Sequence, residues 1–152
     1  MIERRPFSQW EALLACEFVE AQEGRRLKAY RCSAGVATIG VGHTSGVKIG
    51  DVCTDAQATQ WLIDDLDRVA KTLAKKIVVD VTEGQYIALL SLAFNIGTSG
   101  VLNGCPKLMR KLNAGDFEGA ANEFLDCCYA NGRRIEGLAN RREREVQLFL
   151  GG

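Results

Sequence analysis

A short segment of this chain gathers side chains that could carry out acid–base or nucleophilic chemistry. Residues 23–46, EGRRLKAYRCSAGVATIGVGHTSG, contain the carboxylate Glu23, the thiol Cys32, the hydroxyl Thr38 and the only histidine of the sequence, His43. Hydrolysis of a glycosidic bond needs a carboxylic acid that protonates the leaving oxygen, and a second group that activates water or attacks the anomeric carbon. These residue types permit that chemistry, with Glu23 as the acid.

The helix predicted before this segment places Glu23 at its end. Ser8 and Glu11 have the spacing of a capping box, and apolar residues recur at helical spacing after them, which predicts a helix over about 8–22. Gly24 then breaks the helix. At such a junction a carboxyl group can be partly buried and so keep its proton, as a general acid must.

The segment itself has the pattern of a small antiparallel sheet. Short β-prone pieces at 29–31, 36–39 and 47–49 are separated by Ser, Ala and Gly residues that favour tight turns. Cys32 and Thr38 would lie on this sheet, facing the helix that ends near the acid, where the second group of a glycosidase is required.

Helical patterns fill the rest of the chain. Capping boxes at Thr54 and Thr82 predict an amphipathic helix over about 54–76 and a nearly all-apolar, buried helix that Gly97 ends. Further helices are predicted for residues 106–112, from residue 116 onward, and over about 138–150.

These elements predict a single, mostly helical α+β domain spanning residues 1–152. A small lobe with the antiparallel sheet covers about 24–54, and the helix over about 54–76 connects it to a helical lobe. That second lobe takes about 77–152 together with the N-terminal helix.

The charge balance limits the partners. Lysine plus arginine and aspartate plus glutamate number 19 each, so no global excess attracts nucleic acid or an anionic membrane. Glutamates interrupt the N-terminal segment, and no apolar run approaches the roughly 18 residues that span a bilayer. We therefore expect synthesis in the cytoplasm without a signal peptide, no membrane span and no nucleic-acid partner.

The cysteines do not form a metal motif. They stand at positions 16, 32, 53, 105, 127 and 128, without a CxxC pair, and only one histidine accompanies them. A structural zinc site is therefore not expected, nor any other metal or cofactor. Free thiols are the default for a chain without an export signal, and the sequence does not choose among disulfide pairings.

Longer motifs carry a resemblance that periodicity alone does not provide. EGRRLKAYRC followed by GVATIGVGHT is similar to the signature of the phage lysozyme and endolysin family, glycoside hydrolase family 24, which includes the T-even phage lysozymes. The similarity continues in the family's order over nearly the whole chain, through TDAQATQWLIDDL, LAFNIGT, KLMRKLNAGDFEGAANEFL and GRRIEGLANRREREVQLFL. It implies a lysozyme-like fold and cleavage of the β-1,4 bond between N-acetylmuramic acid and N-acetylglucosamine of peptidoglycan.

The resemblance also implies a catalytic triad. In the family the motif glutamate is the acid, the residue nine positions later is usually aspartate but cysteine in a subset, and a threonine six positions beyond completes the set. Here these positions hold Glu23, Cys32 and Thr38, so the chain resembles the subset with cysteine in place of the catalytic aspartate.

That cysteine changes the chemistry available to the second group. A free thiol has a pKa near 8.5 against about 3.9 for aspartate, so Cys32 is a poor general base unless something stabilises its thiolate. Two catalytic roles stay open: a thiol that helps Thr38 hold the attacking water, which we favour, or a thiolate nucleophile. Cys32 could also merely fill space. A thiol in the site would further make activity sensitive to oxidation.

Three residues have supporting roles in the family. The resemblance implies that His43 is structural and pairs with Asp65, although a histidine here could also act as a base. It implies that Arg141 forms an ion pair with Glu23. The alternative for Arg141 is that it belongs, with most charges of RRIEGLANRREREVQ, to a solvated helix face.

Three more positions match the sugar cleft of the family. Phe94 and Asn95 fall where family members line the cleft; Phe94 fits the core equally well, whereas the polar Asn95 suits a position facing substrate. Gly42 can leave room for a glycan contact that a side chain would block.

The resemblance implies a phage or prophage endolysin. It would act as a monomer on peptidoglycan glycan strands to lyse the host cell, reaching the periplasm and the wall through a partner such as a holin. Two alternatives stay open: a lytic transglycosylase, which would leave anhydro-sugar ends, and a non-catalytic peptidoglycan-binding module that has lost turnover with its aspartate.

Overall fold

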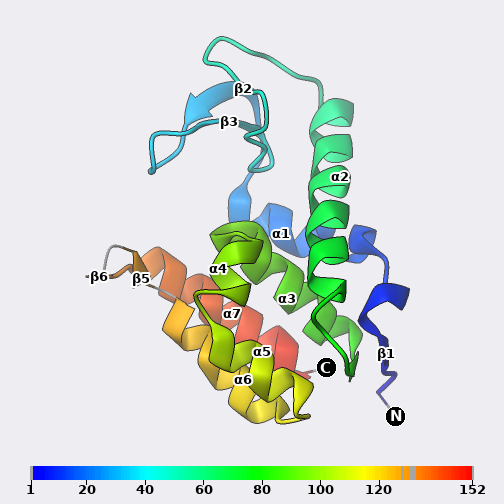
Figure 1. Cartoon of the computed structure of the whole chain (residues 1–152). Helices are drawn as coiled ribbons and strands as arrows, with labels where there is room; N and C mark the ends of the chain where they lie inside the picture. Colours follow the sequence, from blue (N-terminus) through cyan, green and yellow to red (C-terminus); the bar gives the residue numbers. More distant parts are fainter. Residues whose placement is uncertain (1, 128, 131–132, 152) are drawn as a thin grey trace.

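A long helix, α2 (Asp55–Ala74), connects the two parts of the molecule, with a β-hairpin near its N-terminal end and a group of helices around its C-terminal half (Figure 1). The computed structural model describes residues 2–127, 129–130 and 133–151, so Cys128 lies outside the described residues. The helix begins at the predicted capping box: the Thr54 hydroxyl accepts from the Gln57 amide at 3.1 Å, and the Gln57 side chain accepts from the Thr54 amide at 2.9 Å.

The hairpin consists of two antiparallel strands, β2 (Arg26–Arg31) and β3 (Ala37–Gly40), in which Tyr30 pairs with Thr38. The third strand predicted over 47–49 is wrong. Those residues enter a turn in which the Asp51 side chain accepts from the Lys48 amide at 2.8 Å. A single bridge between Lys28 and Val52 is what remains of a third strand.

The predicted first helix is wrong in its N-terminal half. Instead of one helix over 8–22, the chain forms two 3₁₀ turns, η1 (Phe7–Gln9) and η2 (Ala12–Ala15), and only then α1 (Cys16–Glu23). The Ser8 side chain makes no capping hydrogen bond among the described residues. The end of the helix is as expected, because Gly24 caps it with φ of 78°.

Tertiary packing explains that early break. Trp10 is extended between the two turns, with φ −85° and ψ 152°, and its indole Nε1 donates to the Val81 carbonyl at 3.0 Å. Phe7 is buried against Tyr86, with ring centroids 4.8 Å apart. A continuous helix would withdraw these aromatic side chains from their partners, so packing overrides the local capping signal.

The predicted capping box at Thr82 is also present and begins the central helix α3 (Glu83–Ile96). Thr82 and Gln85 exchange the two predicted hydrogen bonds at 3.1 and 3.0 Å. Nearly all of this helix is buried, and it ends at Gly97, with φ of 86°. The prediction of a buried central helix is confirmed.

Shorter helices and the C-terminal helix pack around α3. They are α4 (Thr98–Leu102), α5 (Pro106–Asn113), α6 (Phe117–Phe124), η3 (Leu125–Cys127) and α7 (Glu136–Gly151). Pro106 and Asp116 begin α5 and α6 as predicted, whereas α4 was not predicted. Two further strand pairs join β1 (Arg5–Pro6) to β4 (Asp80–Val81) and β5 (Tyr129–Ala130) to β6 (Arg133–Arg134). The predicted class, a mostly helical α+β fold with a small antiparallel sheet, is confirmed.

Two further features concern cysteines and membranes. Cys105 and Cys127 are joined as a disulfide, a pairing that the sequence left open, and the other described cysteines, Cys16, Cys32 and Cys53, are free. Within the ranges that the structure describes, no helix has the length and apolar character needed to cross a bilayer.

Candidate active site

Glu23 is fixed at the point where α1 gives way to the hairpin. It is the last residue of α1, and its side chain is 21% exposed. One carboxylate oxygen, Oε2, accepts a hydrogen bond from Nη1 of Arg141 on α7. The fold therefore brings together two residues that stand 118 positions apart in the sequence.

The other carboxylate oxygen faces the turn that follows β3. Ile39 and His43 exchange backbone hydrogen bonds of 2.9 and 3.0 Å, which closes a tight turn with Gly42 at φ of 65°. A Cβ atom on Gly42 would lie 3.1 Å from Glu23 Oε1 and 2.9 Å from Phe94 Cε1. The missing side chain at Gly42 thus allows Glu23 and Phe94 to approach the same turn.

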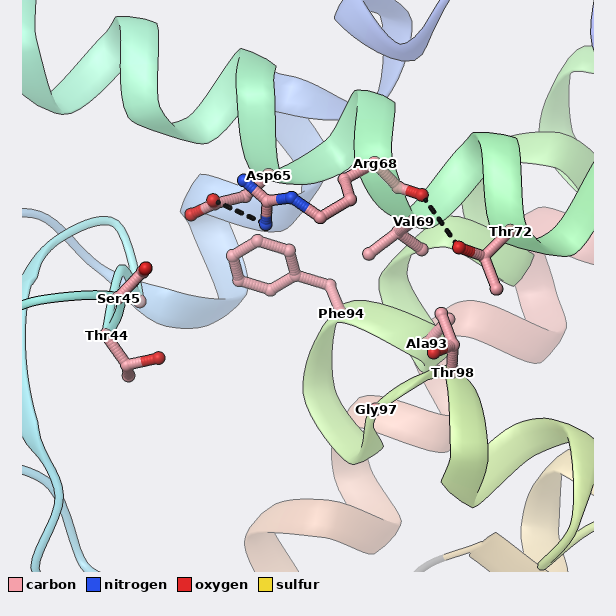
Figure 2. A pocket seen from close by; sticks show the side chains of 11 residues that line it. Thr44, Ser45, Asp65, Arg68, Val69, Thr72, Ala93, Phe94, Gly97 and Thr98 are labelled. Atoms are coloured by element: carbon pink, nitrogen blue, oxygen red, sulfur yellow. Dashed lines mark hydrogen bonds and ion pairs between the residues drawn. The ribbon is translucent and has the colours of Figure 1, made fainter.

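A cavity of about 290 Å³ opens beside this turn (Figure 2). Its wall comes from the loop after β3, from α2, from the end of α3 and from the start of α4. The residues on this wall include Thr44, Ser45, Arg68, Thr72, Phe94 and Thr98. Gly42 and Phe94 line the cavity, and a Cβ atom on Gly42 would meet both Phe94 and Glu23 Oε1, so Oε1 lies close to one residue of the cavity wall. Glu23, Cys32 and Thr38 do not themselves line this cavity.

The two hairpin residues of the predicted triad belong to one tight turn and its strand. Cys32 begins the turn: its amide donates to the Val36 carbonyl at 3.0 Å, and its carbonyl accepts from the Gly35 amide at 2.8 Å. Thr38 on β3 is buried, and its hydroxyl donates to the Val36 carbonyl at 2.9 Å.

This turn alters the acidity of Cys32. The amide of Val36, followed by that of Ala34, stabilises the thiolate and lowers the pKa of the Cys32 thiol below its ordinary value. A source of thiolate stabilisation, which the sequence alone did not reveal, is therefore present in the backbone of the turn.

His43 and Asp65 lie together, as the resemblance implies. His43 Nδ1 is 2.7 Å from Asp65 Oδ2, and both side chains are buried. The imidazole also stacks on Trp61, with ring centroids 4.6 Å apart and planes inclined by 8°. Asp65 Oδ1 accepts from Arg68 at 3.2 Å. These contacts join the turn after β3 to α2, and a role for His43 in holding that turn stays a prediction.

Phe94 and Asn95 differ in their surroundings. Phe94 is partly buried, packs on the core with one side and lines the cavity with another. The side-chain oxygen of Asn95 is shielded from solvent and has no hydrogen-bond partner among the described residues. Asn95 does not line the cavity beside Phe94, so its contact with substrate stays a prediction.

The interpretation of the C-terminal charges as a solvated face is wrong for Arg142 and Glu145, and the alternative that included Arg141 in that face is wrong as well. Arg141, Arg142 and Glu145 are 6%, 0% and 0% exposed, and they form ion pairs with one another beneath Glu23. Sequence reasoning missed Glu145 and Arg142. The available signal was their helical spacing with the buried Phe149, which places positions 142, 145 and 149 on one face.

Within the described part of the chain, no three His, Cys, Asp or Glu side chains are grouped so that they could hold a metal ion. Glu23 is paired with the Arg141 guanidinium, a polar contact that suits a group taking part in proton transfer.

Comparisons with known proteins agree with this architecture. The family model of phage lysozyme matches residues 20–145. The chain is 44% identical over 135 residues to the endolysin of Acyrthosiphon pisum secondary endosymbiont phage 1, covering 86% of this chain and 91% of the relative. It is 38% identical over 137 residues to the endolysin of Salmonella phage P22, covering 87% and 92%.

A solved structure extends the similarity to the fold. The endolysin from Escherichia coli O157:H7 phage FAHEc1 superposes with a TM-score of 0.80 at 29% identity, covering 99% of this chain and 96% of that chain. The similarity therefore includes the hairpin, the long helix and the helices around α3. The chain belongs to the phage lysozyme family.

Proposed function

We propose that this chain is an endolysin in which Glu23 is the general acid for hydrolysis of the β-1,4 bond between N-acetylmuramic acid and N-acetylglucosamine. Membership of the phage lysozyme family makes it a muramidase-type glycoside hydrolase that acts on peptidoglycan of the cell wall. The observation that supports Glu23 as the acid is the different environment of its two oxygens: one is held by Arg141, and the other lies beside Gly42 on the cavity wall.

The two oxygens have separate tasks in this mechanism. Oε2 is occupied by Arg141, so the acid acts on the glycosidic oxygen through Oε1, which lies close to Gly42 on the cavity wall. Transfer of the proton of the acid to the glycosidic oxygen breaks the bond to the leaving sugar and creates a carboxylate. Arg141 then stabilises the new negative charge with a charge-assisted hydrogen bond.

The hairpin supplies the groups for the attacking water. Thr38 uses its hydroxyl proton for the Val36 carbonyl, so its oxygen remains an acceptor for a water proton. The lowered pKa of Cys32 increases its thiolate fraction relative to a free cysteine, which makes it a better acceptor for a second water proton. We propose that Cys32 and Thr38 orient the water together, and a thiolate nucleophile is the competing role.

Delivery to the substrate is a further part of the proposal. We propose that the chain is synthesised in the cytoplasm, acts as a monomer and depends on a holin-type partner to reach the wall. This is supported by the family assignment rather than by a contact in the structure. Cells that produce the protein in the cytoplasm should stay intact until a holin is produced as well; lysis without any holin would contradict the dependence.

The acid can be tested by removing its proton with little change of shape. Glu23→Gln should abolish the turbidity loss of outer-membrane-stripped Gram-negative cells under reducing conditions, because glutamine cannot protonate the leaving oxygen. Glu17→Gln is a matched control, since Glu17 is exposed on the same helix. Equal lysis by wild type and Glu23→Gln would contradict the assignment.

A further inference from the structure

A buried cluster of charges contacts Glu23 through Arg141. We define the Glu145 cluster as Ser91 on α3 and Arg141, Arg142 and Glu145 on α7, all of them buried. Glu145 Oε2 accepts from the Ser91 hydroxyl at 2.5 Å and from Arg141 Nε at 3.3 Å. Arg142 donates to both Glu145 oxygens, at 2.5 and 2.9 Å.

The cluster leaves Arg141 no freedom to turn. Its Nε donates to Glu145, its Nη2 donates to the Ser91 carbonyl at 3.1 Å and contacts the Ser91 hydroxyl at 3.2 Å, and its Nη1 donates to Glu23. Each nitrogen of the guanidinium therefore has a partner, and only Nη1 points to the acid. Because a guanidinium is planar and rigid, fixing two of its nitrogens fixes the third.

The cluster also changes the charge that Glu23 experiences. An isolated Arg141 beside Glu23 would favour the carboxylate over the acid, which opposes the task of a proton donor. The buried carboxylate of Glu145, which Arg141 shares with Arg142, offsets part of that positive charge at short range, where solvent screens little.

We propose that Glu145 is a positioning residue for the reaction. It holds the Arg141 guanidinium in place and offsets part of its charge, so that Glu23 keeps its orientation. This inference rests on the proposed role of Glu23 as the acid. It assigns a function to a residue that never touches the substrate and that the sequence pattern predicted to be solvated.

Within the described residues, groups on other elements also contact the cluster. Glu23 contacts it from α1, and the Cys127 carbonyl of η3 accepts from Arg142 Nη1 at 3.3 Å. The nearby carboxylates differ: Asp126 on η3 is exposed, and Glu123 on α6 pairs with Lys111.

The test is the pH dependence of turnover in Glu145→Gln. This substitution keeps the shape and removes the negative charge, so the full charge of Arg141 favours the carboxylate form of Glu23. The alkaline limb of the activity profile then moves to lower pH. At alkaline pH this is roughly a tenfold loss of rate, which acidification restores.

The assay measures release of reducing ends from soluble glycan fragments at saturating substrate, with binding to purified sacculi measured by pull-down. Glu143→Gln is the matched control, because Glu143 is exposed on the same helix. Circular dichroism establishes that each variant is folded at the assay temperature. We expect unchanged sacculus binding in Glu145→Gln, a displaced alkaline limb, and a wild-type profile in the control.

Three results separate this inference from the proposed function. A folded Glu145→Gln with the wild-type profile, or with a rate lowered equally at every pH, would overturn the positioning role. If Glu23→Gln were as active as wild type, the acid assignment and this inference would both fall. If Glu23→Gln is inactive, the acid assignment stands, and the pH profile of Glu145→Gln then tests only the positioning role of Glu145.

If Glu145→Gln does not fold, a second variant tests the positioning role of Glu145. Ser91→Ala keeps every charge but removes the hydroxyl that donates to Glu145 and contacts Arg141. We expect it to lower the saturating rate several-fold without weakening binding to sacculi, because Arg141 loses one of its fixed contacts. A folded Ser91→Ala with the wild-type rate would overturn the inference.

Discussion

A methyl group placed at residue 42 should disable the site, because it would enter the space between the acid and the cavity. In Gly42→Ala the new Cβ would lie 2.9 Å from Phe94 Cε1 and 3.1 Å from Glu23 Oε1. Ordinary contacts are about 3.5 Å or longer, so Phe94 and Glu23 must each retreat by roughly half an ångström. Since a shift of about 1 Å can cost about a hundredfold in rate, we expect roughly a tenfold loss.

The same substitution also lowers stability, because alanine is strained at the positive φ of residue 42. A second glycine with a similar φ allows this loss of stability to be measured separately. Gly42 and Gly46 have φ of 65° and 70°, where alanine costs about 1 to 2 kcal/mol. Nothing lies within 4 Å of a Cβ on Gly46. Gly46→Ala should therefore lose about that stability and keep its activity, whereas Gly42→Ala should lose at least as much stability and its activity too.

Urea unfolding measures the stability change, and turbidity loss of stripped cells measures the activity, both at a temperature where each variant is folded. The result that refutes the reasoning is equal activity of the two alanine variants at equal folded concentration. It would mean that the Glu23 side chain moves aside at no cost to catalysis, and that Oε1 is not the oxygen that serves the substrate.

Three further predictions concern the hairpin and its attachment to α2. Cys32→Ser should keep most of the lytic activity if the thiol orients water, while Cys32→Asp should raise it; loss of all activity in the serine variant would instead support a nucleophilic thiolate. The turn lowers the pKa of Cys32, whereas burial, followed by Glu20, raises that of Cys16. Because the thiolate is the reactive form, iodoacetamide should label Cys32 at lower pH than Cys16; peptide mass mapping that shows the reverse order would contradict the proposed thiolate stabilisation. Asp65→Asn weakens the contact with His43 and should lower the free energy of unfolding by about 1 to 3 kcal/mol, with activity retained below the melting transition; an unchanged urea midpoint would contradict a structural role for the pair.

Local signals predicted the helices whose ends are set by nearby residues. The boxes at Thr54 and Thr82 involve hydrogen bonds between residues three positions apart, so the sequence contains the whole motif. The same pattern at Ser8 failed, because Trp10 finds a partner in Val81, 71 positions away. Packing of this kind over long sequence distances is not encoded in a local spacing.

The candidate site also combines features that the sequence predicted with features that depend on tertiary packing. Motif spacing predicted Glu23, Cys32 and Thr38 on neighbouring elements, and the family resemblance predicted the contacts of Arg141 and His43. Neither predicted that Gly42 faces Glu23 directly, because that contact depends on how tightly the turn after β3 closes.

The Glu145 cluster was hidden for a different reason. A run of alternating arginine and glutamate on a helix is usually solvated, and charge pattern alone favours that interpretation. Burial of such charges requires partners on other elements, here Ser91 on α3 and Glu23 on α1. Only the packing of α7 against those elements distinguishes a buried ion-pair cluster from a polar surface.

The most direct test of the account identifies the sugar ends that the protein produces. Purified sacculi would be digested in water enriched in heavy oxygen, with wild type and Glu23→Gln in parallel, and the products analysed by mass spectrometry. Hydrolysis with Glu23 as the acid predicts reducing N-acetylmuramic acid ends that carry one heavy oxygen atom, formed by the wild type and not by Glu23→Gln. Anhydro-sugar ends, or the same labelled products from both proteins, would contradict it.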